Sequence, residues 1–280
     1  MMPLAAACGD DDPGLGLSPD LAVHQRTSYA FTQEHYRWIN RHLYKAGESF
    51  VHAFGYGDFN GDGLEDALVF SNEFLATEAV PAKLTLDIDG SNRDGGDLFV
   101  GDPPGGIHPR KLLLGDLNAD GDLDAVLIDH GFDMDPWPGA PLVYLLSNGE
   151  GGMTTKIVTS LTGFHHAGAL GDFDNDGDLD LFLASAPWQG SPHVLLQNDG
   201  SGTMSATELL VGKHWDENIW ASEFVDLDGD GFLDLIIGGA NYNDDSKVLW
   251  GSSKGSYGGE AWALELGANE SYDFDAEDID

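Results

Sequence analysis

The sequence predicts an all-β fold built from repeats of about 56 residues, and three observations support this prediction. A nine-residue acidic motif occurs four times, starting at residues 58, 116, 172 and 226, so consecutive copies lie 58, 56 and 54 residues apart. A short run rich in β-branched and aromatic residues follows each motif, which is typical of a strand buried on both faces. Glycine makes up 38 of the 280 residues, as suits a chain with many turns. A fixed period of this kind indicates a repeat architecture.

The acidic motif has the composition of a calcium-binding loop. Its clearest copy is Asp-Phe-Asp-Asn-Asp-Gly-Asp-Leu-Asp at residues 172–180. Positions 1, 3, 5 and 9 carry Asp or Asn, position 7 varies and is expected to contribute its backbone carbonyl, and position 6 is always the glycine at which the chain must turn sharply. Ca²⁺ accepts about 6–8 oxygen ligands in flexible geometry, whereas Mg²⁺ requires a stricter octahedron. No Cys or His stands at a ligand position, which argues against zinc in these loops.

The sequence therefore predicts about four bound Ca²⁺ ions, one in each of the loops at residues 58–66, 116–124, 172–180 and 226–234. The predicted ligands are Asp58, Asn60, Asp62, Leu64 and Asp66 in the first loop; Asp116, Asn118, Asp120, Asp122 and Asp124 in the second; Asp172, Asp174, Asp176, Asp178 and Asp180 in the third; and Asp226, Asp228, Asp230, Phe232 and Asp234 in the fourth.

The EF-hand is the alternative for such a loop, but it needs a bidentate Glu at position 12 and flanking helices. Position 12 is apolar in every copy, namely Val69, Leu127, Leu183 and Ile237. Since a buried strand also follows each loop, the pattern favours a calcium loop within a β-hairpin.

Each repeat is expected to contain four strands. One strand enters the loop (50–56, 112–114, 166–170 and 220–225), and the buried strand leaves it. A third strand follows a longer connection (83–88, 142–146, 193–197 and 247–250), and a fourth follows a Gly/Asn turn (98–100, 156–159, 208–211 and 261–266). Four strands per repeat correspond to one blade of a β-propeller. A fifth loop begins at Asp278 just before the sequence ends, so we expect an incomplete propeller from a longer protein.

The motif Gly-Asp-Phe-Asp-Asn-Asp-Gly-Asp-Leu-Asp at residues 171–180 resembles the FG-GAP and VCBS repeat families, which are β-propellers related to the integrin α-subunit head. Leu-Leu-Gln-Asn-Asp-Gly-Ser-Gly at 195–202 and Leu-Leu-Ser-Asn-Gly-Glu-Gly at 145–151 resemble the hairpin motif of these families. The resemblance covers roughly residues 50–280 and implies a propeller with bound calcium. It does not imply a single function, because these families include adhesion proteins, lectins and a few enzymes.

The net charge of −37 argues against nucleic acid and anionic membranes as direct partners. The four loops contain 14 ligand carboxylates, and four Ca²⁺ ions would reduce the net charge to about −29. Because like charges crowd each loop, we expect folding to depend on the metal.

Residues 1–20 are interpreted as a truncated leader and flexible tether, and residues 21–280 as the repeat region. Cys8, the only cysteine, follows small residues and precedes an acidic run, which resembles the lipid-attachment site of a bacterial lipoprotein; the alternative is a disordered leader with a chance cysteine. No basic or apolar signal segment precedes it, so we expect the natural start to lie upstream. No segment reaches the length of a transmembrane helix. The expected location is extracellular or on the outer cell surface.

Residues 29–45 are expected to form either a short helix or the outer strands of a partial blade.

Two further sets of large side chains recur. His52, Arg110, His166, Trp220 and Tyr272 stand six residues before each loop, where they either line a central channel or occupy a position that tolerates bulk. Phe74, Phe132, Trp188 and Tyr242 stand sixteen residues after each loop start, where they either stack on sugar rings or cover the blade end.

No nucleophile elbow, zinc-protease motif or P-loop is present, so we expect no catalytic residues. The sequence favours a recognition or adhesion module with structural calcium and a protein or carbohydrate ligand on a propeller rim. The alternative is a calcium-dependent polysaccharide lyase or hydrolase. For that alternative, His214 with Asp216 and Glu217 is the first group to test, because it lies in a segment that breaks the repeat symmetry.

Overall fold

The computed structural model describes residues 50–72, 76–148, 150–186, 192–207, 218–239, 246–253, 255–257 and 261–264. Apart from one short 3₁₀ turn, η1 (Gly96–Leu98), all regular structure in these ranges is β-strand, which confirms the all-β prediction. Some predictions concern residues outside these ranges: the leader with Cys8, the segment 29–45, the group His214, Asp216 and Glu217, the aromatics Phe74, Trp188, Tyr242 and Tyr272, and the loop from Asp278. The side chain of His52 also lies outside the described part of the structure.

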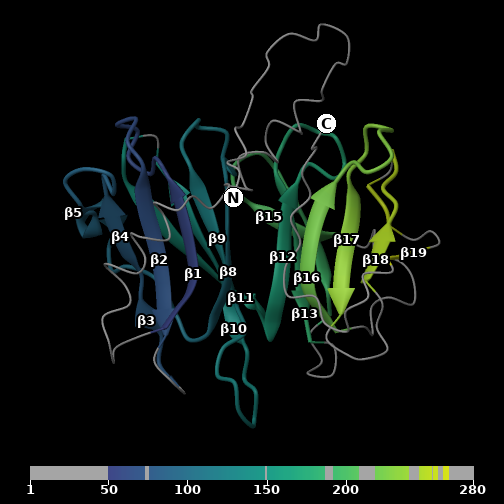
Figure 1. Ribbon diagram of the computed structural model, residues 1–280, viewed down its shortest axis with the longest axis horizontal. Coiled ribbons are helices and arrows are strands. Elements are labelled where there is room, and N and C mark those ends of the chain that lie inside the picture. The colour runs from purple at the N-terminus through teal and green to yellow at the C-terminus, as the bar shows by residue number, and fades with distance from the viewer. Residues whose placement is uncertain are drawn as a thin grey trace, which may run out of the picture.

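Four larger sheets follow one another along the chain and lie in that order across the molecule, from purple to yellow-green in Figure 1. The first sheet has the order β1 (Phe50–Gly57), β2 (Asp66–Asn72), β4 (Lys83–Leu86) and β5 (Arg93–Asp94). The second has the order β6 (Phe99–Val100), β11 (Met153–Gly163), β10 (Ala140–Ser147), β9 (Asp124–Asp129) and β8 (Pro109–Gly115).

The third sheet contains β12 (His165–Gly171), β13 (Asp180–Ser185), β14 (Val194–Asn198) and β15 (Met204–Thr207). The fourth contains β16 (Ile219–Val225), β17 (Asp234–Gly239), β18 (Ser246–Leu249) and β19 (Ala261–Leu264). Two short strands, β3 (Val80–Pro81) and β7 (Gly105–Gly106), pair separately. In every larger sheet an acidic loop joins the two strands of an antiparallel hairpin, namely β1–β2, β8–β9, β12–β13 or β16–β17, as the sequence predicts. These are called the first and second strands of a repeat, and β4, β10, β14 and β18 are its third strand.

The fourth strand of the first repeat differs from its prediction. Residues 98–100 were expected to complete the first sheet, but β6 pairs in parallel with β11 of the second sheet, and β5 completes the first. Burial explains the difference, because Phe99 and Met153 both pack into the apolar cluster between these sheets. The second sheet consequently has five strands. In the third sheet the last described strand is β15, while the predicted strand at 208–211 lies outside the described part of the chain.

The hydrophobic core lies between successive sheets. Separate buried clusters join the first sheet to the second, the second to the third and the third to the fourth. The strand after each loop, β2, β9, β13 or β17, is buried along its whole length, as its apolar composition predicts. The first strands also contact one another in turn, β1 against β8, β8 against β12 and β12 against β16.

Close packing between sheets explains the glycine that precedes two of the acidic loops. A Cβ atom added to Gly115 would lie 2.5 Å from Leu179 Cδ1, and one added to Gly171 would lie 2.7 Å from Leu233 Cδ1. Leu179 and Leu233 belong to the loop of the following sheet, so a side chain at either glycine would clash with the neighbouring repeat.

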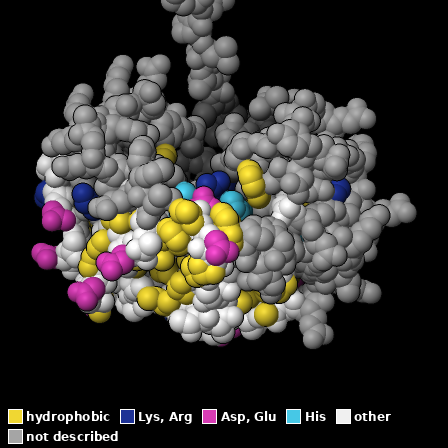
Figure 2. All heavy atoms as spheres, turned by 90° about the horizontal axis from the view of Figure 1, so that it is seen from below, with side chains coloured by type: hydrophobic (Ala, Val, Ile, Leu, Met, Phe, Trp, Pro, Cys, Tyr) yellow, Lys and Arg dark blue, Asp and Glu magenta, His cyan; other side chains and the backbone are white. Residues whose placement is uncertain are grey.

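In Figure 2, which views the molecule from another side, histidine side chains gather with basic and acidic side chains near the middle of the face.

Candidate metal centres in the acidic loops

Backbone N–H groups shape each acidic loop around its first carboxylate. The N–H of the position-6 glycine donates to the position-1 Asp in all four copies: Gly63 to Asp58 at 2.7 Å, Gly121 to Asp116, Gly177 to Asp172 and Gly231 to Asp226, each at 2.9 Å. The four glycines have φ between +80° and +100°, and a Cβ added to any of them would meet nothing within 4 Å. The requirement for glycine is therefore conformational, as the sharp turn predicts.

The position-9 aspartates join each loop to the third strand of its sheet. These four residues, Asp66, Asp124, Asp180 and Asp234, are at most 1% exposed. One oxygen accepts the N–H of loop position 2, from Phe59, Leu117, Phe173 or Leu227 at 2.7–3.2 Å. The other accepts an N–H at or just beyond an end of the third strand, from Asp87, Ser147, Asn198 or Gly251 at 2.6–2.9 Å. Sequence reasoning predicted these aspartates only as ligands and missed their role in connecting the strands.

Burial makes these carboxylates electrostatically costly without a cation. Desolvation, assisted by the charges of Asp174 and Asp176 and opposed by its backbone hydrogen bonds, raises the pKa of Asp180 to about 8. Desolvation likewise raises the pKa of Asp124 to about 6. A bound cation would favour the charged form of both groups.

The third and fourth loops bring predicted ligands together. Carboxylate oxygens of Asp172, Asp174 and Asp180 lie within 4.8 Å of one another, and so do those of Asp226, Asp228 and Asp230. In addition, Asp116 Oδ1 and Asp174 Oδ1 are buried and have no hydrogen-bond partner among the described residues. These side-chain donors are all oxygens, so the sites suit a hard cation such as Ca²⁺. Coordination by the position-7 carbonyls stays a prediction.

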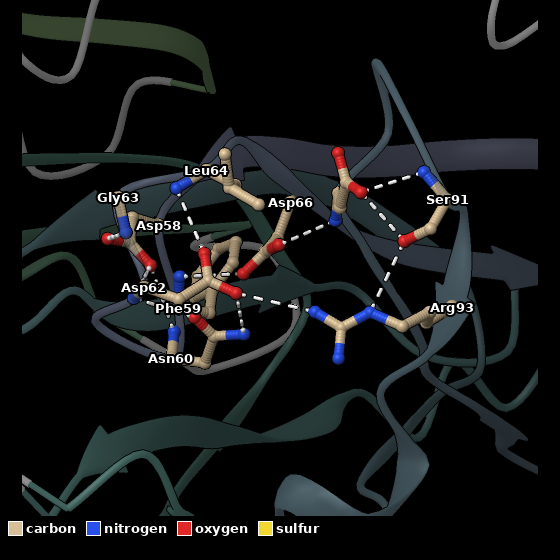
Figure 3. Close-up of polar contacts among 10 residues, drawn as sticks. Asp58, Phe59, Asn60, Asp62, Gly63, Leu64, Asp66, Ser91 and Arg93 are labelled. Atoms are coloured by element: carbon tan, nitrogen blue, oxygen red, sulfur yellow. Dashed lines mark hydrogen bonds and ion pairs between the residues drawn. The ribbon is translucent and has the colours of Figure 1, made fainter.

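The first loop contains a basic neighbour that the sequence analysis missed. Arg93 Nη2 lies 3.3 Å from Asp62 Oδ2 at loop position 5, as Figure 3 shows. Asn60 Nδ2 also donates to the same oxygen, at 3.1 Å. A guanidinium therefore occupies part of the coordination space that a cation would use in this loop.

Neighbouring loops are linked to each other as well. Asn175 Nδ2 of the third loop donates to Gly231 O of the fourth at 3.0 Å. Asn198 Nδ2 donates to Leu117 O in the second loop at 2.7 Å and to Leu179 O in the third at 3.0 Å. The Gln197 side chain donates to Asp174. The second, third and fourth loops are thus joined by side-chain hydrogen bonds.

A second group of polar and aromatic residues lies at the opposite end of the first strands. Of the residues predicted six positions before the loops, His166 and Trp220 stack with ring centroids 5.1 Å apart, and the charge of Arg110 acts on His166. His108 and His130 join them, and sequence reasoning missed both. The available signal was a break in symmetry: Asp129-His130 stand where the other repeats have Ser-Asn, Ser-Ala and Gly-Ala.

Comparison with known families supports the repeat assignment. Residues 116–183 and 172–237 match the model of the FG-GAP-like repeat. Residues 116–237 carry FG-GAP-like repeats. This confirms the predicted FG-GAP resemblance for the second and third repeats and for the fourth as far as its buried strand β17.

Two solved structures match the chain at low similarity. They are rhamnogalacturonan lyase PL11 of Bacillus licheniformis, with 12% identity and a TM-score of 0.43, and rhamnogalacturonan lyase YesW, with 12% identity and a TM-score of 0.41. Each comparison covers 77% of this chain and 55% of the other. The chain thus spans about half the length of the structures it matches. Within the described residues, no helix is long and apolar enough to cross a membrane.

Proposed function

We propose that the chain is a calcium-binding β-propeller module that acts in extracellular recognition or adhesion. The observation that carries the proposal is the fourfold acidic loop, in which N–H groups orient the position-1 and position-9 carboxylates in the same way each time. Repetition of one donor arrangement in four places is expected of a structural ion site and is not expected of a single catalytic site.

Propeller architecture is the proposed arrangement of the four sheets. In a propeller the first strand of each blade lies nearest a common axis, and the core fills the space between blades. Two observations support this: the first strands β1, β8, β12 and β16 contact one another in sequence, and the apolar clusters each join two successive sheets.

Calcium has a structural role in this proposal. Because each position-9 aspartate bonds both to its loop and to the third strand, an ion in the loop would stabilise the whole hairpin-plus-strand unit. The ion would also offset the repulsion among the carboxylates of one loop. Binding to the folded state alone then raises stability by mass action.

Isothermal titration of the metal-free protein with calcium tests this proposal directly. We expect about four sites, with affinities near the 10⁻⁴–10⁻³ M typical of extracellular modules. A stoichiometry of one or zero would contradict the assignment of the loops.

The proposed ligand is a protein or carbohydrate bound on a rim of the propeller. A glycan array and a cell-binding assay, each with and without calcium, test recognition. Calcium-independent binding, or none to any glycan or cell, would count against it.

A polysaccharide-active enzyme is the second candidate. It is favoured by the gathering of Arg110, His130, His166 and Asp133 in one place, since shifted pKa values cluster at functional sites. An assay that follows both unsaturated product and new reducing ends separates the two candidates, because a lyase or a hydrolase gives turnover in it and a recognition module gives none.

A further inference from the structure

The strongest feature outside the acidic loops is a group of side chains at the other end of the first strands, here called the histidine cluster. Its members are His108, Arg110, His130, Asp133, Phe164, His166 and Trp220. Figure 2 shows histidine, basic and acidic side chains together near the middle of one face. The acidic loops contain no histidine, so the calcium proposal does not explain why three histidines gather here in a chain of net charge −37.

Three members of the histidine cluster offer metal-ligand atoms close together. One atom from each of His108, His130 and Asp133 lies within 4.8 Å of the other two. In a tetrahedral zinc site the ligand atoms are about 3.4 Å apart, so an ion would draw these side chains inward by roughly 1 Å. The Asp133 side chain is exposed and has room to move. Two imidazoles and one carboxylate suit zinc or another late transition metal, unlike the oxygen-only loops.

His130 is oriented in the way that a metal ligand requires. Its Nδ1 lies 3.0 Å from the carbonyl oxygen of Gly131, which can only accept, so Nδ1 carries the proton and Nε2 keeps its lone pair. The ring is 1% exposed and stacks on Phe164 at a centroid distance of 4.3 Å.

The carboxylate of Asp129 holds the two histidine segments together. Its Oδ1 accepts the N–H groups of His108 at 2.9 Å and Gly131 at 2.7 Å, and its Oδ2 accepts the N–H of Ile107 at 2.6 Å. Asp129 is 3% exposed and lies at the end of β9. The other repeats have Ser71, Ser185 and Gly239 at this position, so the second repeat alone combines this support with the histidines.

From this geometry we propose that His108, His130 and Asp133 bind a divalent transition-metal ion of the zinc class, at a site distinct from the acidic loops. The Asp133 carboxylate supplies negative charge beside the nearby Arg110. Three protein ligands leave a fourth position open for water or a small ligand. The site would take Zn²⁺ while the loops hold Ca²⁺, because the two ions prefer different donor atoms.

The test is a titration of the full chain with ZnCl₂ near neutral pH, with calcium present in saturating excess so that the acidic loops are occupied. We expect one equivalent of zinc by calorimetry, and CoCl₂ in place of zinc to give the strong visible absorption of four-coordinate cobalt. Asp133→Asn and His130→Ala should each weaken zinc binding at least tenfold, a conservative figure since loss of a supporting partner alone costs about 10–100-fold. His108→Gln is a third variant in case His130→Ala does not fold.

Asp135→Asn is the matched control, because Asp135 is an exposed aspartate two residues away that does not belong to the ligand group. It should leave zinc affinity unchanged. Absence of zinc binding, competition of zinc with calcium for the same sites, or full affinity in Asp133→Asn would overturn the proposal. Calcium stoichiometry is measured on every variant, so failure of the zinc site and failure of the calcium loops are distinguishable.

Discussion

The side chain of Asn198, in the third sheet, donates to the backbone carbonyl of Leu117 in the acidic loop of the second sheet, 81 positions earlier, at 2.7 Å. The same amide donates to Leu179 O, and the Asn198 N–H donates to Asp180. One buried residue therefore connects two acidic loops and the end of β14. Neighbouring repeats are coupled through polar contacts as well as through the apolar core.

Replacement Asn198→Ala should destabilise the protein by about 1–3 kcal/mol, because it leaves two buried carbonyl oxygens without these donors. Chemical denaturation in saturating calcium measures the loss. Asn148→Ala is the matched control, since the Asn148 side chain is exposed and caps only its own turn. Equal losses for the two variants would show that the link to Leu117 contributes nothing.

The double variant Asp174→Ala with Asp176→Ala should remove one calcium ion and one increment of calcium-dependent stability. Both residues are predicted ligands of the third loop, and Asp174 Oδ1 is buried without a partner among the described residues. Melting temperature is measured across a calcium titration and again in chelator. In chelator the variant should melt no lower than the parent, because two repelling charges have been removed. An unchanged calcium stoichiometry would remove the third loop from the proposal.

In chelator, stability should pass through a maximum between about pH 6 and 7. Burial raises the pKa of Asp180 to about 8, so the folded state binds protons more tightly than the unfolded chain and loses stability as pH rises toward 8. Burial lowers the pKa of His165 to about 4 and that of His166 to about 3, so stability is also lost as pH falls below the unfolded histidine value of about 6.5.

Denaturation curves at several pH values measure this profile. Asp180→Asn should flatten the alkaline side, and saturating calcium should do the same in the parent protein, because the cation offsets the buried charge. If the stability of Asp180→Asn fell as steeply with rising pH as that of the parent protein, the alkaline loss of stability would come from another titrating group.

Arg93→Gln should raise the calcium affinity of the first loop. The guanidinium lies 3.3 Å from Asp62 and opposes the approach of a cation to the same carboxylate. Because the pair is partly exposed, solvent and salt screen it, and we expect a change of only a few-fold in the dissociation constant. Calorimetry at low ionic strength measures it, with Lys83→Gln as a control for the general loss of one exposed positive charge. Equal changes in both variants would indicate a nonspecific charge effect.

Much of the fold follows from local patterns in the sequence. The strand after each loop is continuously apolar, and all four are buried as expected. The position-6 glycines adopt the positive φ that the sharp turn requires. Each of these features depends only on residues close together in the chain. The sequence pattern therefore predicts them without information on distant contacts.

Pairings between distant segments were not predictable in the same way. Sequence alignment places Asn148 opposite Asn198, but the hydrogen bonds make Ser147 the equivalent of Asn198, because both donate their N–H to a position-9 aspartate. The strand β6 pairs with β11 of the second sheet, and Phe99 is buried in the apolar cluster between the first and second sheets. Local sequence does not indicate which of two available sheet edges a short strand will join.

The sequence by itself determined that the chain is built from repeated β-hairpins around acidic loops, because alternating carboxylates, glycine and apolar strands act within a few residues of one another. Tertiary structure alone decided that the position-9 aspartates bind the third strands, that Arg93 contacts Asp62, and that the rings of His108 and His130 lie together on segments that Asp129 connects. Each of these contacts joins segments whose separation in space depends on packing between strands or sheets, and that packing is a property of the whole chain.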